Sequence, residues 1–204
     1  MQVDPRHRNE TFDTSTIGAY LQSYAARLGE ALRTVNSAML DQARSVIESA
    51  AAKGARIYAV GNGGSAAIAD HLCCDWTKGT HVEGHPTISS FSMSANVALY
   101  SAIANDFGFE KVFSTQVNFH GQAGDVLVAI SSSGNSPNIL AAVEAAHARG
   151  MASIGLSGFK GGKLKDIAQT PLHVLADNYG IVEDAHQALM HVLAQFIAVR
   201  RDTA

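Results

Sequence analysis

The sequence predicts an α/β protein with one parallel sheet that helices cover on both faces. Short apolar runs alternate with helical segments along the chain, and this alternation is typical of parallel sheets. The runs are apolar throughout rather than at every second position, as expected of strands buried on both faces. Small-residue loops rich in glycine or serine follow two of the runs, which suggests ligand-binding turns at one edge of the sheet.

The order of elements indicates a single domain over residues 1–204. The polar stretch 1–14 contains a proline and is expected to be mobile. Apolar residues at helical spacing predict two helices over 15–52, with a break near Asn36. The expected strands are 55–60, 87–93, 125–130, 152–157 and 170–176, and the expected helices among and after them are 65–78, 95–104, 109–120, 137–149 and 181–199.

Composition and charge narrow the class of protein. The 204-residue chain has a net charge of −3 and no long basic run. A duplex-binding protein would carry a larger positive patch, so no nucleic-acid partner is expected. No apolar run approaches the roughly 20 residues of a spanning helix, so no membrane partner is expected. The polar N-terminus does not resemble a signal peptide, and the only two cysteines, Cys73 and Cys74, are adjacent. These features predict a cytoplasmic protein.

Two loops between strands and helices are candidate phosphate sites. They are GNGGS at 61–65 and SSSGNS at 131–136. Glycine lets backbone amides approach a ligand, serine adds hydroxyls, and a helix start favours an anion. Ser136 and Pro137 are expected at the N-cap and first helical position. Neither loop contains lysine or arginine, so a phosphate would be held by amides and hydroxyls, as in a sugar phosphate. The alternative is a pair of capped turns without a ligand.

A second pattern suggests a metal site. His71 and Asp75 are four residues apart on one predicted helix, and Glu183 and His191 are eight apart on the last one, so each pair shares a face. Imidazole and carboxylate groups are good zinc ligands. Two ligands from each helix would complete a four-ligand site. The alternative for each histidine is a packing or solvated residue, and spacing alone leaves open whether the helices meet.

With these motifs in place, the sequence resembles the sugar isomerase (SIS) domain, and within it the bacterial phosphoheptose isomerases. The similarity covers nearly the whole chain. It is carried by GNGGSAAIADH from Gly61, ANDFGF at 104–109, the SSSGNS block within 124–151, GGKL at 161–164, and the pair Glu183 and His191. The resemblance implies a five-stranded parallel sheet of flavodoxin-like type. It also implies a homotetramer built around the helices, with active sites at the subunit interfaces.

The resemblance further implies an activity and a set of site residues. The activity is isomerisation of sedoheptulose 7-phosphate to D-glycero-D-manno-heptose 7-phosphate, for the heptose of lipopolysaccharide or capsule. A zinc ion near the reacting end of the sugar is implied. The implied residues are His71, Asp75, Glu183 and His191 for the metal, Ser131, Ser132, Ser133 and Ser136 for the phosphate, and Asn62, Ser65 and Asn96 for substrate contact.

Several site positions depart from the family pattern. Asp75 stands where glutamate is usual, Glu183 where glutamine is usual, and Asn96 where aspartate is usual. Lys78 stands in place of an expected arginine. Asp75 is the candidate base and His191 the candidate acid, with Glu183 able to share or replace the role of the shorter Asp75.

Two alternatives to this activity remain at this point. One is a non-catalytic SIS protein that resembles the DnaA initiator-associating protein, a binding partner in replication initiation. The other is an isomerase for a different phosphosugar. All four metal positions carry potential ligands, which favours an enzyme.

Overall fold

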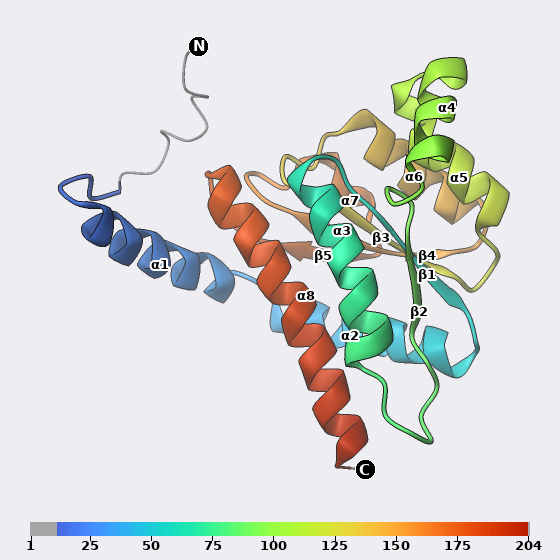
Figure 1. Ribbon diagram of the computed structural model, residues 1–204, viewed down its shortest axis with the longest axis horizontal. Helices are drawn as coiled ribbons and strands as arrows, with labels where there is room; N and C mark the ends of the chain where they lie inside the picture. Colours follow the sequence, from blue (N-terminus) through green and yellow to red (C-terminus); the bar gives the residue numbers. More distant parts are fainter. Residues whose placement is uncertain (1–11, 204) are drawn as a thin grey trace.

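The computed structural model describes residues 12–203. Residues 1–11, which make up most of the stretch predicted to be mobile, lie outside this described part. Within it, five parallel strands form one sheet in the order β2-β1-β3-β4-β5 (Figure 1). The predicted α/β class with a five-stranded parallel sheet is confirmed. The strands are β1 Arg56–Val60, β2 Ser89–Ser92, β3 Val126–Ser131, β4 Ala152–Ser157 and β5 Thr170–His173.

Helices cover the sheet on both sides. Their bounds are α1 Ile17–Arg33, α2 Ser37–Ala52, α3 Gly64–Cys74, α4 Val97–Phe107, α5 Val112–His120, α6 Pro137–Ala148, α7 Gly162–Ile167 and α8 Tyr179–Asp202. The break between α1 and α2 lies where it was expected, because Asn36 caps α2 by accepting a hydrogen bond from the amide of Ala38.

The two faces of the sheet support two separate cores. In β3, Val126 and Val128 belong to the core shared with α2, α3 and α8, and Leu127 and Ala129 belong to the core shared with α5 and α6. Successive strand residues point to opposite faces. A strand covered on both sides must therefore be apolar at every position, which is the pattern found in the sequence.

Some elements differ from the sequence expectation. The six-residue helix α7, Gly162–Ile167, was not expected, because it is too short for a clear apolar period and begins among glycines. The strand expected over 170–176 is the shorter Thr170–His173. The last helix begins two residues earlier and ends three residues later than the expected 181–199.

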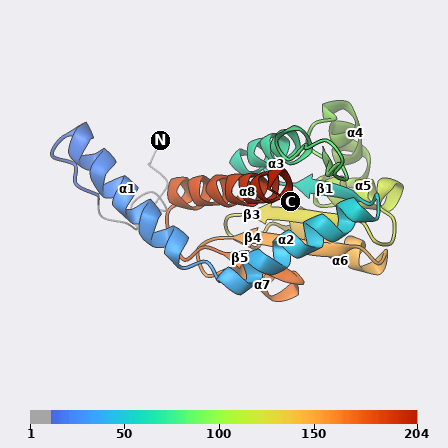
Figure 2. The same cartoon turned by 90° about the horizontal axis from the view of Figure 1, so that it is seen from below.

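Helix α1 projects from the body of the domain, as Figure 2 shows from below. Its inner face packs on the core through partly buried Leu28 and Leu32. Its outer face exposes Ile17 and Leu21, which are 86% and 60% accessible. The hydroxyl of Tyr24 donates a 2.6 Å hydrogen bond to Asp184 and so joins α1 to α8. Among the described residues, no helix has the length and hydropathy of a membrane span.

Candidate active site

Two helices that run side by side in the same direction position the candidate site. α3 follows the first small-residue loop and α8 is the last helix of the chain (Figure 1). Just beyond α3, the buried indole nitrogen of Trp76 donates a 3.2 Å hydrogen bond to the backbone carbonyl of Met190. This contact fixes the two helices against each other. The question that spacing left open is answered, because the two helices do meet.

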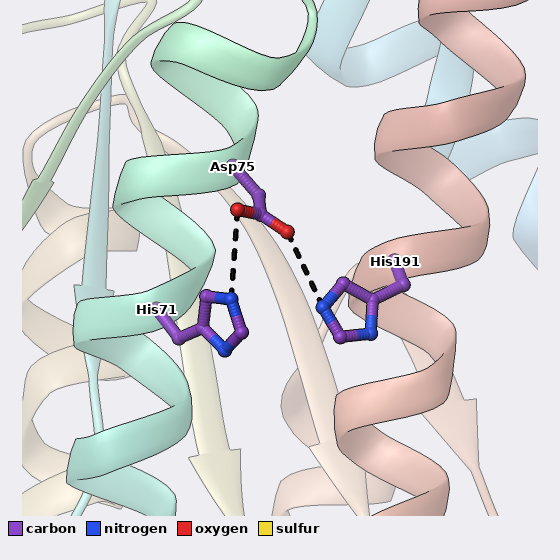
Figure 3. A group of neighbouring side chains, drawn as sticks. All are labelled: His71, Asp75 and His191. Carbon is purple, nitrogen blue, oxygen red and sulfur yellow. Dashed lines mark ion pairs between the residues drawn. The ribbon is translucent and has the colours of Figure 1, made fainter.

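A His–Asp–His group lies between these helices (Figure 3). One carboxylate oxygen of Asp75 lies 3.5 Å from Nε2 of His71, and the other lies 3.2 Å from Nε2 of His191. One ligand atom from each of the three residues lies within 4.8 Å of the others, so the group can bind a metal ion. The side chains are 49%, 30% and 36% exposed for His71, Asp75 and His191. Two imidazoles and a carboxylate with solvent access fit a catalytic zinc site, which keeps one position open.

The end of α3 sets the position of Asp75. The periodicity predicts a helix over 65–78, but the α-helix ends at Cys74 and one π-helical turn, Asp75–Gly79, follows it. His71 and Asp75 still share the face that their four-residue spacing predicts. The wider turn begins at Asp75 itself, and single π-turns of this kind are frequent at functional sites.

Gln187 also contacts this group, although no sequence motif includes it. Its side-chain amide lies 2.8 Å from Nδ1 of His71 and 3.4 Å from Nε2 of His191. It occupies the same stripe of α8 as Glu183 and His191, four residues from each. This spacing would have indicated Gln187 once it was known that α3 faces this stripe of α8.

Glu183 lies at the other end of the helix pair. It packs over the first residue of α3 so closely that a Cβ on Gly64 would overlap its carboxylate. It lines a pocket with the serine loop and is not a member of the His–Asp–His group among the described residues. A carboxylate beside the first turn of a helix is stabilised by the unpaired amides there. Its assignment as a metal ligand stays a prediction.

The two small-residue loops meet in a pocket of about 180 Å³. The pocket brings together six of the predicted substrate residues: Asn62, Ser65, Ser131, Ser132, Ser133 and Ser136, with Tyr179 and Glu183 beside them. The hydroxyls of Ser131 and Ser136 lie 3.1 Å apart. The buried hydroxyl of Ser132 has no hydrogen-bond partner among the described residues. A buried polar atom of this kind requires a partner, and a phosphate oxygen would supply one.

Ser136 and Pro137 occupy the N-cap and first helical positions, as predicted. The side chain of Ser136 makes no capping hydrogen bond, however, and its hydroxyl faces Ser131 instead. The first amides of α6 therefore lack a serine cap. A helix start favours an anion through its positive dipole end, and the start of α6 borders the pocket at Ser136.

A buried residue that the sequence did not reveal supports the first loop. Asn138 is 1% exposed, and its side chain exchanges two hydrogen bonds of 2.9 Å with that of Asn62. This reciprocal amide pair ties the loop after β1 to the start of α6. Because 76 residues separate the partners in sequence, no local pattern indicates the pair.

The serine loop is held by close backbone contact with Gly161 and Gly162 at the start of α7. Gly134 has a φ of +67°, and the amide of Leu164 donates a 2.9 Å hydrogen bond to its carbonyl. A Cβ on Gly134 would collide with the backbone of Gly161. The position therefore needs glycine for two reasons, the left-handed backbone and the close approach.

A Gly134→Ala substitution is expected to displace the serine loop. The strain and the clash should lower the free energy of unfolding by about 1–3 kcal/mol and weaken phosphate binding. Urea denaturation and inorganic phosphate titration would measure the two effects. Gly54→Ala is a matched control, since it has a similar φ of +66° and nothing within 4 Å of the added Cβ. Equal phosphate binding by Gly134→Ala and wild type would contradict the expectation.

Asn96 lies apart from the serine pocket. Its side chain caps α4 by accepting a 3.1 Å hydrogen bond from the amide of Leu99. It lines a different cavity of about 340 Å³, together with Tyr58 and Phe91. Lys78 is exposed in the π-turn. The structure thus gives Asn96 a structural role, and its assignment to substrate binding stays a prediction.

The adjacent cysteines are both free thiols. Burial raises the pKa of the Cys73 thiol to about 12, so it is protonated at neutral pH and unreactive. Cys73 is partly buried and packs against the core from α3. Cys74 is exposed.

These features define a class of protein. It is a parallel α/β domain with a serine-rich pocket after two of its strands and a His–Asp–His group between two helices. The SIS domain family matches residues 19–158 of the chain. A phosphoheptose isomerase from Rhodospirillum rubrum is 36% identical over 156 residues, covering 76% of this chain and 82% of that protein. One from Burkholderia pseudomallei is 31% identical over 194 residues, covering 94% and 95% of the two chains.

The solved structures lead to the same family. The fold matches a phosphoheptose isomerase from Neisseria gonorrhoeae with a TM-score of 0.81 and 32% identity, over 89% of this chain and 98% of that one. It also matches a phosphoheptose isomerase from Francisella tularensis with a TM-score of 0.81 and 31% identity, over 89% of this chain and 96% of that one. The chain belongs to the phosphoheptose isomerase family of SIS-domain proteins.

Proposed function

We propose that this protein is a metal-dependent aldose–ketose isomerase acting on a phosphosugar, with sedoheptulose 7-phosphate as substrate and D-glycero-D-manno-heptose 7-phosphate as product. The observation that carries the proposal is the placement of two polar centres on one helix pair. The serine pocket lies at the start of α3 and α8, and the His–Asp–His group lies further along both helices. The first centre suits a phosphate and the second suits proton transfer next to a carbonyl.

The separation of the two centres supports a long, open-chain substrate. Ser65 lines the pocket, and His71 follows six residues later on the same helix. At 1.5 Å per residue the rise between them is about 9 Å. This length is of the order of an extended seven-carbon chain with its phosphate in the pocket and its C1–C2 end beside His71.

The isomerisation needs only proton transfers. A base removes a proton from C1 of the ketose, the resulting enediol accepts a proton at C2, and a proton moves between the oxygens on C1 and C2. Asp75 is the proposed base and His191 the proposed acid, and their side chains lie 3.2 Å apart. Glu183 is the alternative base, approaching from the pocket side.

A divalent ion such as zinc would be held by His71, Asp75 and His191, whose donor set fits it. When bound, it supplies positive charge that stabilises the oxygens on which negative charge develops. A carboxylate engaged as a ligand is a weaker base, so the ligand and base roles of Asp75 compete. This competition is the reason for retaining Glu183 as the alternative.

A homotetramer forms part of the proposal. The exposed apolar face of α1 supports it, together with Val192, Phe196 and Val199, which are 53%, 48% and 62% exposed along α8. Apolar side chains gathered on helices in this way mark contact surfaces. Contact of these helices with other copies would place subunit interfaces next to the site.

A panel of ketose phosphates with five, six and seven carbons tests the function. Turnover is expected to be highest on the seven-carbon substrate and roughly 100-fold or more lower on the five-carbon one, whose reacting carbons fall short of the His–Asp–His group. Chelation should remove the activity and zinc should restore it. Unphosphorylated sedoheptulose is the matched control for the pocket. No turnover of any phosphosugar by the zinc-loaded protein would overturn the proposal in favour of a non-catalytic SIS protein.

A further inference from the structure

We propose that Gln187 is a positioning residue that stabilises the ligand tautomer of His71 when the His–Asp–His group binds a metal ion. The inference rests on the proposed function of this site but concerns a residue that neither the motifs nor the donor group includes. The inference depends on which of the two ring nitrogens of His71 is in contact with Gln187. Nε2 of His71 faces Asp75, and the amide of Gln187 lies 2.8 Å from the opposite nitrogen, Nδ1.

His71 needs such a partner more than His191 does. Its side chain is 49% exposed at the surface of α3, so packing alone does not fix its ring. Its ring stands nearly perpendicular to that of His191, at 79°, with the ring centres 5.0 Å apart. The amide of Gln187 reaches both rings from α8, with the weaker contact of 3.4 Å to His191. It therefore bridges the two histidines, at the far nitrogen Nδ1 of His71 and at Nε2 of His191, the nitrogen that also faces Asp75.

The side-chain amide of Gln187 can form a hydrogen bond with either tautomer of the His71 ring. The oxygen and nitrogen of a glutamine side chain have nearly the same shape, and the amide can turn over. With its nitrogen towards Nδ1, the amide donates a proton, so Nε2 carries the ring proton and points it at Asp75. With its oxygen towards Nδ1, the amide accepts the proton of Nδ1 and leaves the lone pair of Nε2 on the Asp75 side. Only the second state lets Nε2 serve as a ligand.

Gln187 thus satisfies His71 with and without a metal ion, and it favours the ligand tautomer once an ion is present. Partners of this kind, bonded to the far nitrogen of a ligating histidine, typically contribute 10–100-fold to metal affinity. A carboxylate at position 187 would accept a hydrogen bond and never donate one, so it would hold His71 in the ligand tautomer permanently. A methionine fills the same space and does neither.

The experiment measures the affinity of the metal-free full chain for zinc by competition with a chromophoric chelator, and the absorption spectrum of the cobalt-saturated protein. Gln187→Met is expected to weaken zinc binding by 10–100-fold, with unchanged cobalt band positions and intensity because the donor set is intact. Gln187→Glu is expected to restore affinity to at least that of wild type. Gln195→Met, an exposed position two turns further along α8, is the control, and melting curves verify that each variant is folded.

The outcomes separate this inference from the function on which it rests. If wild type binds neither zinc nor cobalt, the metal-dependent function fails and the inference fails with it. If wild type binds zinc and Gln187→Met binds it equally well, only the role of Gln187 is overturned. A changed cobalt spectrum in saturated Gln187→Met would also overturn the inference, because Gln187 would then be a ligand itself. If Gln187→Met and Gln187→Glu both bind zinc more weakly than wild type, residue 187 acts by packing and not by hydrogen bonding, and the inference is overturned.

Discussion

Replacing His191 with alanine is expected to lower kcat/KM for the phosphosugar by about 10²–10⁴-fold, the usual contribution of a positioned acid or base. The reason is geometric. His191 is the only member of the His–Asp–His group contributed by α8, and its Nε2 is 3.2 Å from the carboxylate of Asp75. The side chain is partly exposed, so its loss should leave the core intact. Because His191 is also a proposed zinc ligand, steady-state assays at a zinc concentration that saturates the variant measure the effect.

A second measurement distinguishes an acid from a base. If His191 protonates oxygen while Asp75 handles the carbon proton, the His191→Ala variant should still exchange the C1 proton with deuterium from solvent. Overall turnover should then fall further than exchange. Equal losses of both would assign His191 to the carbon proton as well. Gln195→Ala, an exposed position one turn further along α8, should retain wild-type activity. Wild-type turnover by His191→Ala would remove His191 from the chemistry.

The sheet was predictable because strands buried on both faces have a distinctive composition. β3 is the clearest case, since all six of its residues are buried and the apolar run in the sequence covers nearly the same span. The short helix Gly162–Ile167 was not predictable in this way. Six residues give fewer than two helical turns, and its position is fixed by contact between its preceding glycines and the serine loop.

The site was predictable where its parts are local in sequence. The four-residue spacing of His71 and Asp75 and the serine run at 131–136 each indicate their chemistry from a few neighbouring residues. The parts that were missed depend on contacts across the fold. Gln187 acquires its role only because α3 lies opposite, 116 residues earlier in the chain, and Asn138 only because Asn62 lies within reach.

Glu183 shows a further limit of the motif. Its eight-residue spacing from His191 places both on one stripe of α8, but eight residues also correspond to a rise of about 12 Å along the helix. A shared stripe is therefore compatible with two different sites along it. The structure places Glu183 beside Gly64 in the serine pocket and His191 beside Asp75. Of the four ligands that the resemblance implies, Glu183 is the one outside the His–Asp–His group, and its role as a ligand stays a prediction.

Acid is expected to destabilise the fold through a histidine on the opposite face of the same helix. His186 is fully buried, and neither of its ring nitrogens has a hydrogen-bond partner among the described residues. Burial lowers the pKa of His186 from 6.5 to about 4. The Ser157 backbone opposes this shift in part, and the nearby His173 adds to it. The folded protein therefore holds the ring neutral where the unfolded chain would bind a proton. The free energy of unfolding should fall as pH drops from about 6.5 to about 4, by about 3 kcal/mol in total.

Urea denaturation between pH 7 and pH 4.5 measures this loss, and His186→Leu should remove most of it. Leucine is apolar and of similar size, and at most a weak contact with the Ser157 backbone is lost, so stability at pH 7 should change little. His173→Gln is the matched control. Burial also lowers the pKa of His173, but that ring is less buried and lies near a Ser157 hydroxyl, so the pH slope should change less. Identical pH slopes for wild type and His186→Leu would contradict the assignment.

The same variant separates two causes of any activity loss at low pH. α8 carries His191 and Gln187 on its site face and His186 on its buried face, so protonation of His186 would destabilise the helix that supplies one side of the site. If activity below pH 6 is lost through unfolding, His186→Leu should extend the active range towards lower pH. If the loss reflects protonation of the reacting groups themselves, the pH profile of His186→Leu should coincide with that of wild type.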